Sequence, residues 1–431
     1  MSERPRRTAG TPAGGQYAYN ASGAEADLNL TAPNRGWPAL DYEDVQWRLS
    51  DELRGAAPIQ QVIRLEARPY QAAIPATIAD LDPLAELSPA SIEQAADAAA
   101  QILMFDREAA ALPVPMPAVL LRTESASSSQ IEHLTANSRN LATAALGITA
   151  GQNADLVADN VAAMTRAMTG SGDLTREHIL HIHHTLMERS EPDIAGHFRR
   201  EPVWIGKPNL SPHGADFIPP RWERINDCVD DLTAFSRRLE LNAIVLAAIT
   251  HAQFETIHPF VDGNGRTGRA IVHTLLRNTG HAMATTVPVS SGLLGDVDGY
   301  FRSLSAYRQG DISPIVDTFA TSAMRAVANG RRLANDTTRI HDDWRARIRA
   351  RSDSGAWRLA DHLFAQPVVN SGHVARFLGS SPQGAFNAIG TLVDAGVLTQ
   401  TSRDRRNQLW QAKDVLDAMD DFAARATRRG L

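Results

Sequence analysis

The sequence is poor in cysteine, since Cys228 is the single thiol among 431 residues. One thiol cannot form a disulfide or a cysteine-rich zinc site within the chain, so neither can stabilise this fold. Long apolar runs are also absent: the best one, Ile244–Ile249, is short and amphipathic, whereas a membrane span needs about 20 apolar residues. The N-terminal arginines are not followed by the apolar core of a secretory signal. We therefore expect a cytoplasmic protein without a membrane partner.

An excess of charge of one sign is lacking as well. The net charge is −6, and charged residues make up 21% of the chain. This balance argues against a protein that coats nucleic acid over its whole surface, although it does not address a local basic patch. With 43% apolar residues and this length, we expect a globular protein of about two to three domains with a sizeable core.

The most informative stretch that is present is the polar run His258–Arg269, which reads HPFVDGNGRTGR. Apolar residues at positions i, i+3, i+4, i+7 and i+8 precede it over 241–252, and a similar pattern follows it over 271–276 up to Gly280. Each pattern places its apolar residues on one face of a helix. The polar run is therefore predicted to join two buried helices and to open the second.

Backbone and charge in this run favour a polyphosphate ligand. Gly263 and Gly265 allow a tight turn whose N–H groups approach a ligand closely, and the first turn of the second helix adds unpaired N–H donors. Arg266 and Arg269 are one helical turn apart, so both guanidinium groups can reach the same anion.

Two further side chains indicate the reaction. Asp262 is suited to Mg²⁺, which binds proteins through one or two carboxylates together with phosphate oxygens. His258 is the nearby group that can take a proton near neutral pH. A base beside a magnesium-bound polyphosphate suggests transfer of part of a nucleotide to a hydroxyl group.

The run resembles the Fic motif, H-x-F-x-(D/E)-G-N-G-R-x-x-R, at every fixed position. The matching residues are His258, Phe260, Asp262, Gly263, Asn264, Gly265, Arg266 and Arg269, and Pro259 is also typical. In the related Doc group a lysine typically replaces the second glycine and phosphate is transferred. The presence of Gly265 therefore implies transfer of AMP from ATP to a Ser, Thr or Tyr hydroxyl of a protein.

The same resemblance implies roles for individual residues. His258 and Asn264 would be catalytic, and Asp262 would hold Mg²⁺. The implied nucleotide-binding residues are Glu132, Gly263, Asn264, Gly265, Arg266, Thr267, Gly268, Arg269, Tyr300 and Arg308. Tyr300 and Arg308 stand where family members carry aromatic and polar residues that line the nucleotide pocket. Packing of these two side chains in the core is the alternative.

The segment Leu121–His133 resembles the inhibitory helix of Fic proteins, (S/T)-x-x-x-E-(G/N). Ser128 and Glu132 match, whereas His133 stands where glycine or asparagine is usual. The resemblance implies that Glu132 pairs with Arg269 and prevents this arginine from holding the γ-phosphate. A solvated glutamate on a helix surface is the alternative.

A Gly- and Pro-rich stretch over 196–220 resembles the Fic flap, a β-hairpin that docks the target in extended form. The implied docking residues are Val203, Trp204, Ile205 and Gly206. Backbone pairing with the flap would place a target hydroxyl beside His258 with little sequence preference. An ordinary surface hairpin is the alternative.

A helix is predicted over Thr175–Met187, before the flap stretch, with Asp173 as a candidate N-cap. It contains four histidines. They are His178, His181, His183 and His184. Histidines at i and i+3 share a helix face, so a metal site is one hypothesis. No complete ligand set is apparent, and we favour a half-buried helix with histidines on its rim.

The last part of the chain reads as three helices and a hairpin: Trp357–Phe364, Ser371–Leu378, 382–395, then strands Val397–Gln400 and Gln408–Gln411. This order resembles the winged helix found at the C-terminus of many Fic proteins. DNA binding would use the third helix and the phosphate-contacting residues Arg403, Arg405 and Arg406. Ten basic against eight acidic residues over 351–431 make a weak DNA footprint, so packing or dimer contacts are the alternative.

We therefore predict a mainly α protein with a Fic-fold helical bundle, a β-hairpin flap and a C-terminal winged helix. The predicted segments are 1–35, disordered; 36–170, N-terminal helices with the inhibitory helix; 171–330, Fic core; 331–350, a solvated linker helix; and 351–431, winged helix. The predicted activity is that of a protein adenylyltransferase that uses ATP and Mg²⁺. The alternatives are removal of AMP from modified proteins at the same site, or a DNA-binding transcriptional regulator with a vestigial site. The target is open, including the protein itself, and so is a homodimer.

Overall fold

The computed structural model describes residues 36–49, 60, 66–169, 172–206, 211–401 and 408–428. The predicted disordered segment 1–35 lies outside these residues, and so does the turn that carries Arg403, Arg405 and Arg406. The described part of the chain is mainly helical, as predicted. Its helices are all too short or too polar to cross a membrane.

The N-terminal helices are α3 (Pro89–Ala110), α4 (Met116–Ile131), α5 (Ser138–Ala144) and α6 (Gln152–Thr169). The Ser88 hydroxyl starts α3 by accepting a hydrogen bond from the N–H of Ser91. The predicted inhibitory segment coincides with the end of α4. This helix packs against α6, α11 and, further along the chain, α14 and α17.

The middle of the chain forms the bundle that surrounds the polar run. Its helices are α7 (Arg176–Met187), α8 (Ile225–Ser236), α9 (Ala243–Ile257), α10 (Asn264–Asn278), α11 (Val289–Leu293) and α12 (Val297–Arg308). Every residue of α9 is buried, so this helix is the centre of the core rather than the one-sided helix that its apolar spacing predicts.

One local prediction in this bundle is wrong. The N-cap of α7 is Thr175, whose hydroxyl accepts from the N–H of His178, and not Asp173. The stretch 285–295 contains α11 and a 3-10 turn over Leu294–Asp296. Small residues of α11 allow it to pack against both α13 and α4, which stabilises a helix too short to persist alone.

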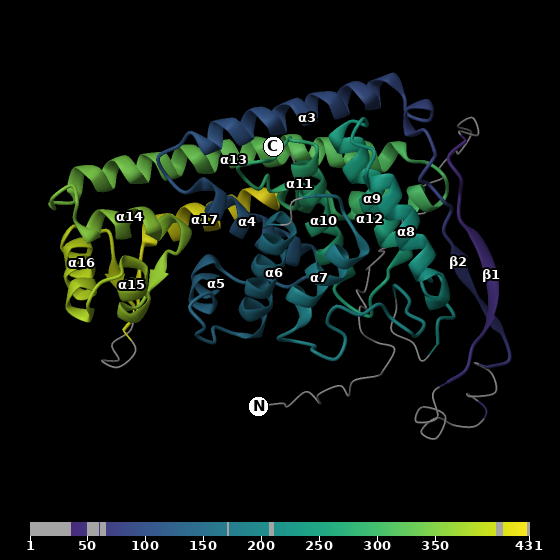
Figure 1. Ribbon diagram of the computed structural model, residues 1–431, viewed down its shortest axis with the longest axis horizontal. Helices are drawn as coiled ribbons and strands as arrows, with labels where there is room; N and C mark the ends of the chain where they lie inside the picture. Colours follow the sequence, from purple (N-terminus) through teal and green to yellow (C-terminus); the bar gives the residue numbers. More distant parts are fainter. Residues whose placement is uncertain are drawn as a thin grey trace.

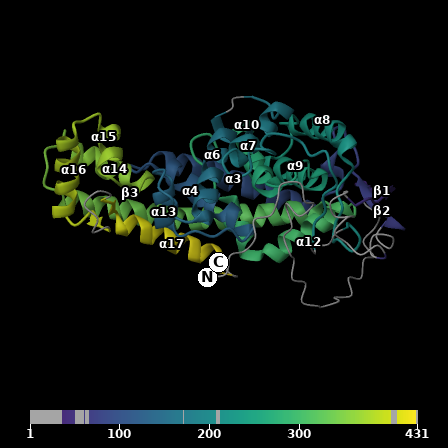
Figure 2. The ribbon, with the colours of Figure 1, turned by 90° about the horizontal axis from the view of Figure 1, so that it is seen from below.

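The predicted linker helix is wrong as a separate element, because it is the second half of the 35-residue helix α13 (Ser313–Arg347). Leu333 and Trp344 are buried within that half, so it is part of the core despite its many charges. Figures 1 and 2 show α13 running the length of the molecule, with α3 beside its first half. The core and the C-terminal region therefore share one continuous helix.

The C-terminal region follows α13 as α14 (Gly355–Ala365), β3 (Val368–Val369), α15 (Ser371–Leu378), α16 (Pro382–Asp394), β4 (Thr399–Gln400), β5 (Trp410–Gln411) and α17 (Lys413–Ala426). The strands pair antiparallel in the order β3-β5-β4. These helix bounds match the predicted ones within two residues, while the winged-helix assignment and DNA binding stay predictions. The sequence reasoning missed α17, which returns along α13 to contact α4 and α5 (Figure 1).

An antiparallel pair at the other end of the molecule was also missed. β1 (Asp41–Gln46) pairs with β2 (Pro69–Ile74) along six residues each. Trp47 and Tyr70, at the ends of these strands, bury their rings against Trp204 in a small second apolar cluster. This cluster attaches the flap stretch to the β1–β2 pair.

Candidate active site

Two left-handed residues shape the turn between α9 and α10. His258 ends α9 with φ 48° and ψ 61°, and Gly263 precedes α10 with φ 76°. A Cβ at position 263 would lie 3.1 Å from the sulfur of Met187, so glycine is required there for space as well as for φ. No side chain caps the N-terminus of α10, which leaves its first N–H groups available to an anion.

Asn264 holds this turn closed instead of facing its open side. Its Oδ1 accepts from the N–H of Phe260, and its Nδ2 donates to the Phe260 carbonyl, both at 2.9 Å. Both ends of the amide are therefore engaged. Each end can still take a second partner, because an amide oxygen has two lone pairs and an amide nitrogen carries two hydrogens, so the catalytic role of Asn264 stays a prediction.

Arg199 fixes the carboxyl end of α9. Its guanidinium donates to the carbonyl oxygens of His258 at 2.8 Å, Pro220 at 2.6 Å and Ile257 at 3.4 Å, and the side chain is 3% exposed. A cation here satisfies free carbonyls and opposes the negative end of the helix dipole. The sequence reasoning missed Arg199, although it follows Gly196, His197 and Phe198 in the stretch singled out as the flap.

His183 positions the turn from the other side. Its Nδ1 accepts from the N–H of Gly196 at 3.0 Å, so Nε2 carries the proton and donates to the carbonyl of Asp262 at 3.0 Å. The ring stacks on Phe260 with centroids 3.7 Å apart. Burial lowers the pKa of His183 to about 4, so the ring stays neutral and keeps both bonds near pH 7.

The metal hypothesis for the four histidines of α7 is not supported. Within the described residues, no group of three or more His, Cys, Asp or Glu side chains could hold a metal ion. His183 points at the motif, whereas His184 faces Glu188 on the exposed side of α7. The metal hypothesis was based on histidines at i and i+3, but His183 and His184 are neighbours in the chain, so their side chains project to different sides of the helix.

The environment of His258 favours a neutral imidazole. Burial, together with the charges of Arg199 and Arg308, lowers the pKa of His258 to about 3. A neutral ring offers a nitrogen lone pair to a proton near pH 7, as a general base must, and the negative charge of a polyphosphate bound beside it would raise its basicity. Its Nδ1 lies 3.8 Å from the Glu255 carboxylate.

Glu255 is a buried carboxyl that the sequence reasoning missed. Burial raises the pKa of Glu255 to about 7; Arg269 opposes this shift and Glu132 adds to it. One of its oxygens lies 4.0 Å from His251 Nε2 and the other is the neighbour of His258. A carboxyl that titrates near neutrality therefore lies directly behind the imidazole.

Glu132 occupies the place between the two motif arginines. Its Oε2 accepts from Arg266 Nε at 2.9 Å and its Oε1 accepts from Arg269 Nη2 at 2.6 Å. The predicted contact with Arg269 is confirmed, and the contact with Arg266 is additional. Ser128 contributes its hydroxyl and carbonyl oxygens to Arg269 at 2.8 and 2.9 Å. All three charged side chains are at most 7% exposed, so the cluster is closed to solvent.

The charges of Glu132 and Arg269 stabilise each other strongly. Burial alone would lower the pKa of Arg269, but the charge of Glu132 more than offsets it and the pKa is raised. Gly265 makes the close approach of these groups possible, since a Cβ there would lie 2.8 Å from Arg269 Nη1 and even closer to the Glu132 carboxylate. A larger residue at position 265 would therefore clash with the Glu132 carboxylate, and it would also clash with a ligand that takes the place of that carboxylate.

The backbone conformation at His133 shows why glycine or asparagine would fit this position better than histidine. α4 ends in a Schellman arrangement, with His133 N–H donating to Gln130 and Leu134 N–H donating to Ser129. His133 takes the left-handed conformation at φ 62°, which glycine and asparagine adopt most readily. A histidine in this place adds backbone strain at the end of the helix that carries Glu132.

Replacing His133 with glycine should therefore stabilise the end of α4. Relief of the left-handed conformation is offset in part by the entropy of glycine in the unfolded chain, which leaves a gain of about 0.5–1 kcal/mol. Local opening of the last turn should become roughly two- to fivefold rarer. Amide hydrogen exchange at Glu132, His133 and Leu134 measures it, and His133→Ala, which keeps the strain, should show no slowing.

Two further residues of the motif pack against the bundle. Thr267 is fully buried, and a Cβ at Gly268 would lie about 3.0 Å from Phe254 and Glu255 on α9. Gly268 thus allows α10 to lie close to α9. Nucleotide binding by these two positions stays a prediction.

Tyr300 and Arg308 approach the site from α12. The hydroxyl of Tyr300 lies 2.7 Å from His251 Nε2, and the ring is 1% exposed, so it is a core aromatic behind the arginine cluster. Arg308 donates to the Glu255 carbonyl at 3.3 Å and stacks 3.7 Å above the ring of Phe217. Packing, the alternative given for both residues, describes Tyr300, while Arg308 links the flap stretch to the charge around His258.

The predicted flap is a single bridge among the described residues. Ile205 pairs with Phe217 in antiparallel fashion, and residues 207–210 lie outside the described part of the chain. Val203 and Trp204 are buried, and Trp204 packs in the small apolar cluster, while docking of a target by backbone pairing with this stretch stays a prediction. Gly206 turns the backbone at φ 116° beside Asp216.

Asp262 fits a magnesium ion that is bound together with phosphate. Its side chain is 29% exposed; Oδ1 accepts from the N–H of Gly263 at 2.6 Å and lies 3.9 Å from Arg266. The second oxygen has no partner among the described residues. One open carboxylate oxygen beside two arginines is a suitable single protein ligand for Mg²⁺, which takes its other ligands from phosphate and water.

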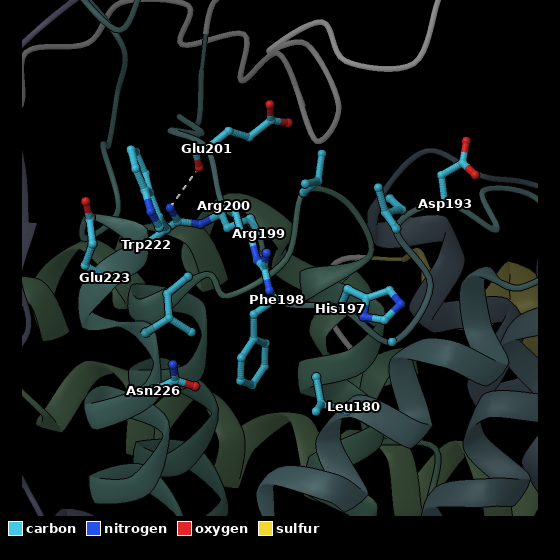
Figure 3. Close-up of a pocket in the computed structure, with 14 residues that line it drawn as sticks. Leu180, Asp193, His197, Phe198, Arg199, Arg200, Glu201, Trp222, Glu223 and Asn226 are labelled. Atoms are coloured by element: carbon cyan, nitrogen blue, oxygen red, sulfur yellow. Dashed lines mark hydrogen bonds between the residues drawn. The ribbon is translucent and has the colours of Figure 1, made fainter.

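A cavity of about 720 Å³ adjoins the motif at Val261. In Figure 3, Trp222, Glu223 and Asn226 lie on one side of it and Leu180, His197 and Asp193 on the other, with Phe198 and Arg199 between them. The lining combines apolar side chains with both signs of charge.

Part of the chain, including the motif, is similar to known proteins. Residues 173–276 match the Fic/DOC family. A Drosophila sechellia protein named protein adenylyltransferase Fic is 32% identical over 146 residues, which is 33% of this chain and 27% of that protein. A Caenorhabditis elegans protein named protein adenylyltransferase fic-1 is 29% identical over 144 residues, 33% of this chain and 26% of that protein. The match thus spans about a quarter of the length of these curated relatives.

A solved structure shares the fold over a larger part of the chain. The crystal structure of a Fic family protein from Desulfovibrio desulfuricans G20 superposes with a TM-score of 0.50 and 22% sequence identity. The superposition covers 76% of this chain and 96% of that one. The likeness concerns the fold alone.

Proposed function

We propose, from the premise that residues 173–276 form a Fic/DOC domain, that the protein transfers AMP from ATP to a hydroxyl group of a protein. The observation that carries this proposal is the neutral, buried His258 beside a turn that ends in two arginines. Curated relatives of this domain are named protein adenylyltransferases.

The acceptor step follows from the geometry around His258. The imidazole takes the proton of a Ser, Thr or Tyr hydroxyl as the hydroxyl oxygen forms a bond to the α-phosphorus of ATP. The bond between that phosphorus and the bridging oxygen breaks, and pyrophosphate leaves. Arg199 and His183 keep the turn in place, so that the ring is oriented before the substrate arrives.

Charge on the leaving pyrophosphate would be held by α10. Arg266, Arg269 and the uncapped N–H groups after Gly263 supply positive charge and donors. Mg²⁺ bound between Asp262 and phosphate oxygens would neutralise further charge on the leaving group. We assign Asn264 to holding the turn, since its amide is engaged by Phe260.

Glu132 is proposed to inhibit this reaction in cis. Its carboxylate takes the donors of Arg266 and Arg269 that the outer phosphates would need. The hydrolytic alternative, in which Glu132 positions a water molecule, stays open, because each carboxylate oxygen can accept a further hydrogen bond. A segment of the target would dock at the flap stretch and the cavity beside Val261.

The proposal is tested by incubating the Glu132→Gly variant with ATP, Mg²⁺ and a cell lysate, followed by mass spectrometry. We expect AMP on hydroxyl side chains, either of lysate proteins or of the protein itself. Parallel reactions with label on the α- or the γ-phosphate separate the two chemistries. Incorporation of the γ-label would indicate phosphate transfer, and incorporation of neither would remove the proposed activity.

A further inference from the structure

A second cavity, of about 260 Å³, lies on the far face of the inhibitory helix. From α4 it is lined by Thr123, Ala126, Ser127 and Gln130, whose spacing of i, i+3, i+4 and i+7 places them on one helix face. The opposite wall comes from α17, with Met419, Asp420 and Phe422, and the floor from the start of α5.

The adjoining face of α4 contacts the catalytic helix. Glu124, wholly buried, accepts from His273 of α10 at 2.8 Å and from the N–H of Ser290 at 2.9 Å. One turn further along, Ser128 meets Arg269. α4 is therefore held between the catalytic helix on one side and the cavity on the other.

Arg122 gives the cavity an uncompensated positive charge. Its Nη2 donates to the amide oxygen of Gln366 at 2.9 Å, while Nη1 is buried without an acceptor among the described residues. No carboxylate acts on this guanidinium, and burial lowers the pKa of Arg122 to about 10. A neutral amide does not balance a buried cation, so an anionic partner is the missing element.

The remaining polar groups of the lining are suited to the same partner. The side chains of Ser127, Gln130 and Ser138 have no hydrogen-bond partner in the part of the chain that the structure describes. Asp420 is the acid of the lining, but it is exposed and already accepts from the N–H of Ser138. Hydroxyl and amide donors around one guanidinium match a small molecule with several oxygen acceptors.

We propose that this cavity binds a small oxyanion, a carboxylate or a phosphate, through Arg122, and that the bound anion holds α4 against the catalytic helix. The cavity exists between α4 and α17 only while α4 is docked, so a ligand of the cavity favours the docked state by linkage. Because docked α4 places Glu132 on Arg266 and Arg269, the anion acts together with Glu132. This regulatory half rests on the proposed adenylyl transfer, whereas the binding half does not.

Binding is tested by calorimetric titration of inorganic phosphate, and in parallel of succinate, at constant ionic strength. Loss of a charge-assisted hydrogen bond predicts that Arg122→Gln weakens binding by at least about tenfold. Arg139→Gln, which removes an exposed charge on α5, should leave it within about twofold, and Arg122→Lys, which keeps the charge, should retain measurable binding. The tighter of the two probes identifies the anion class.

Three outcomes would overturn the binding half. They are absence of heat for both anions in the wild type, unchanged affinity in Arg122→Gln, and loss of affinity in Arg269→Gln but not in Arg122→Gln, which would locate the anion at the motif. A folding defect is distinguished by Arg122→Lys, since a misfolded site would not recover with the charge.

Regulation is read by hydrogen exchange and by labelling. The preferred anion should slow exchange at the amides of 123–131 and lower wild-type labelling, and both effects should vanish in Arg122→Gln. Competition with ATP at the motif would persist in Arg122→Gln and would contradict the regulatory half. If no variant is labelled, adenylyl transfer fails as the function while the binding result stands.

Discussion

Replacing Glu132 with glycine should raise labelling of protein by ATP that carries its label on the α-phosphate by about two to four orders of magnitude. The carboxylate holds one hydrogen bond to Arg266 and one to Arg269, and such charge-assisted bonds contribute about 1.5–3 kcal/mol each. Without it, both guanidinium groups are free to bind phosphates. Glu132→Gln, which keeps the shape and removes the charge, should give an intermediate rate.

The same substitution should make the unliganded protein less stable. Breaking a buried charge cluster leaves Arg269 with Ser128 but without its carboxylate, at a cost of about 3–5 kcal/mol. ATP with Mg²⁺ should then raise the melting temperature of the variant more than that of the wild type. Equal labelling by both proteins, with equal stabilisation by ATP, would show that Glu132 does not inhibit.

Removal of the imidazole should have the largest effect in the opposite direction. In the Glu132→Gly background, His258→Ala should lower α-label incorporation by about 10²–10⁴-fold, the usual contribution of a general base. ATP binding should change little, because the arginines and the turn before α10 are untouched. The measurement is the rate of labelling at saturating ATP, with ATP affinity measured separately.

Position 258 has a left-handed backbone, so the alanine variant can also lose stability, and this loss must be separated from the loss of the base. Alanine keeps the strain of about 1–2 kcal/mol that the histidine already bears at φ 48°, and it loses the packing of the buried ring. Asparagine tolerates this conformation and cannot act as a base, so His258→Asn should be as inactive as His258→Ala but more stable. Residual labelling above one tenth of the parent rate in His258→Asn would remove His258 from its role.

The sequence was sufficient for the parts of the site that lie close together in the chain. The motif run predicts the turn, the start of α10 and the two arginines one turn apart, and the family resemblance supplied the distant contact between Glu132 and Arg269. Spacing alone could not have supplied it, because 137 residues separate the two. A glutamate near a helix end is otherwise an ordinary surface residue.

The supporting residues escaped prediction because their partners are backbone atoms. Arg199 binds carbonyl oxygens of α9, and His183 bridges an N–H and a carbonyl; any sequence offers such groups, so no pattern marks them. Composition misled the reading of α13, whose charges lie on the outer side while Leu333 and Trp344 face the core. The anchoring of the flap stretch was not foreseen for a related reason, since Trp204 packs in a small cluster with Trp47 that comes from a distant part of the chain.

Because Glu132 belongs to the same polypeptide as the arginines that it binds, protein concentration does not affect this contact. A tethered competitor has a fixed effective molarity, set by the chain that joins it to its binding place. Dilution would release a separate inhibitory subunit, but it cannot release a group at the end of α4. Under the proposed inhibition by Glu132, the fraction of molecules in the blocked state is therefore the same at low and at high protein concentration, until another molecule alters the docking of that helix.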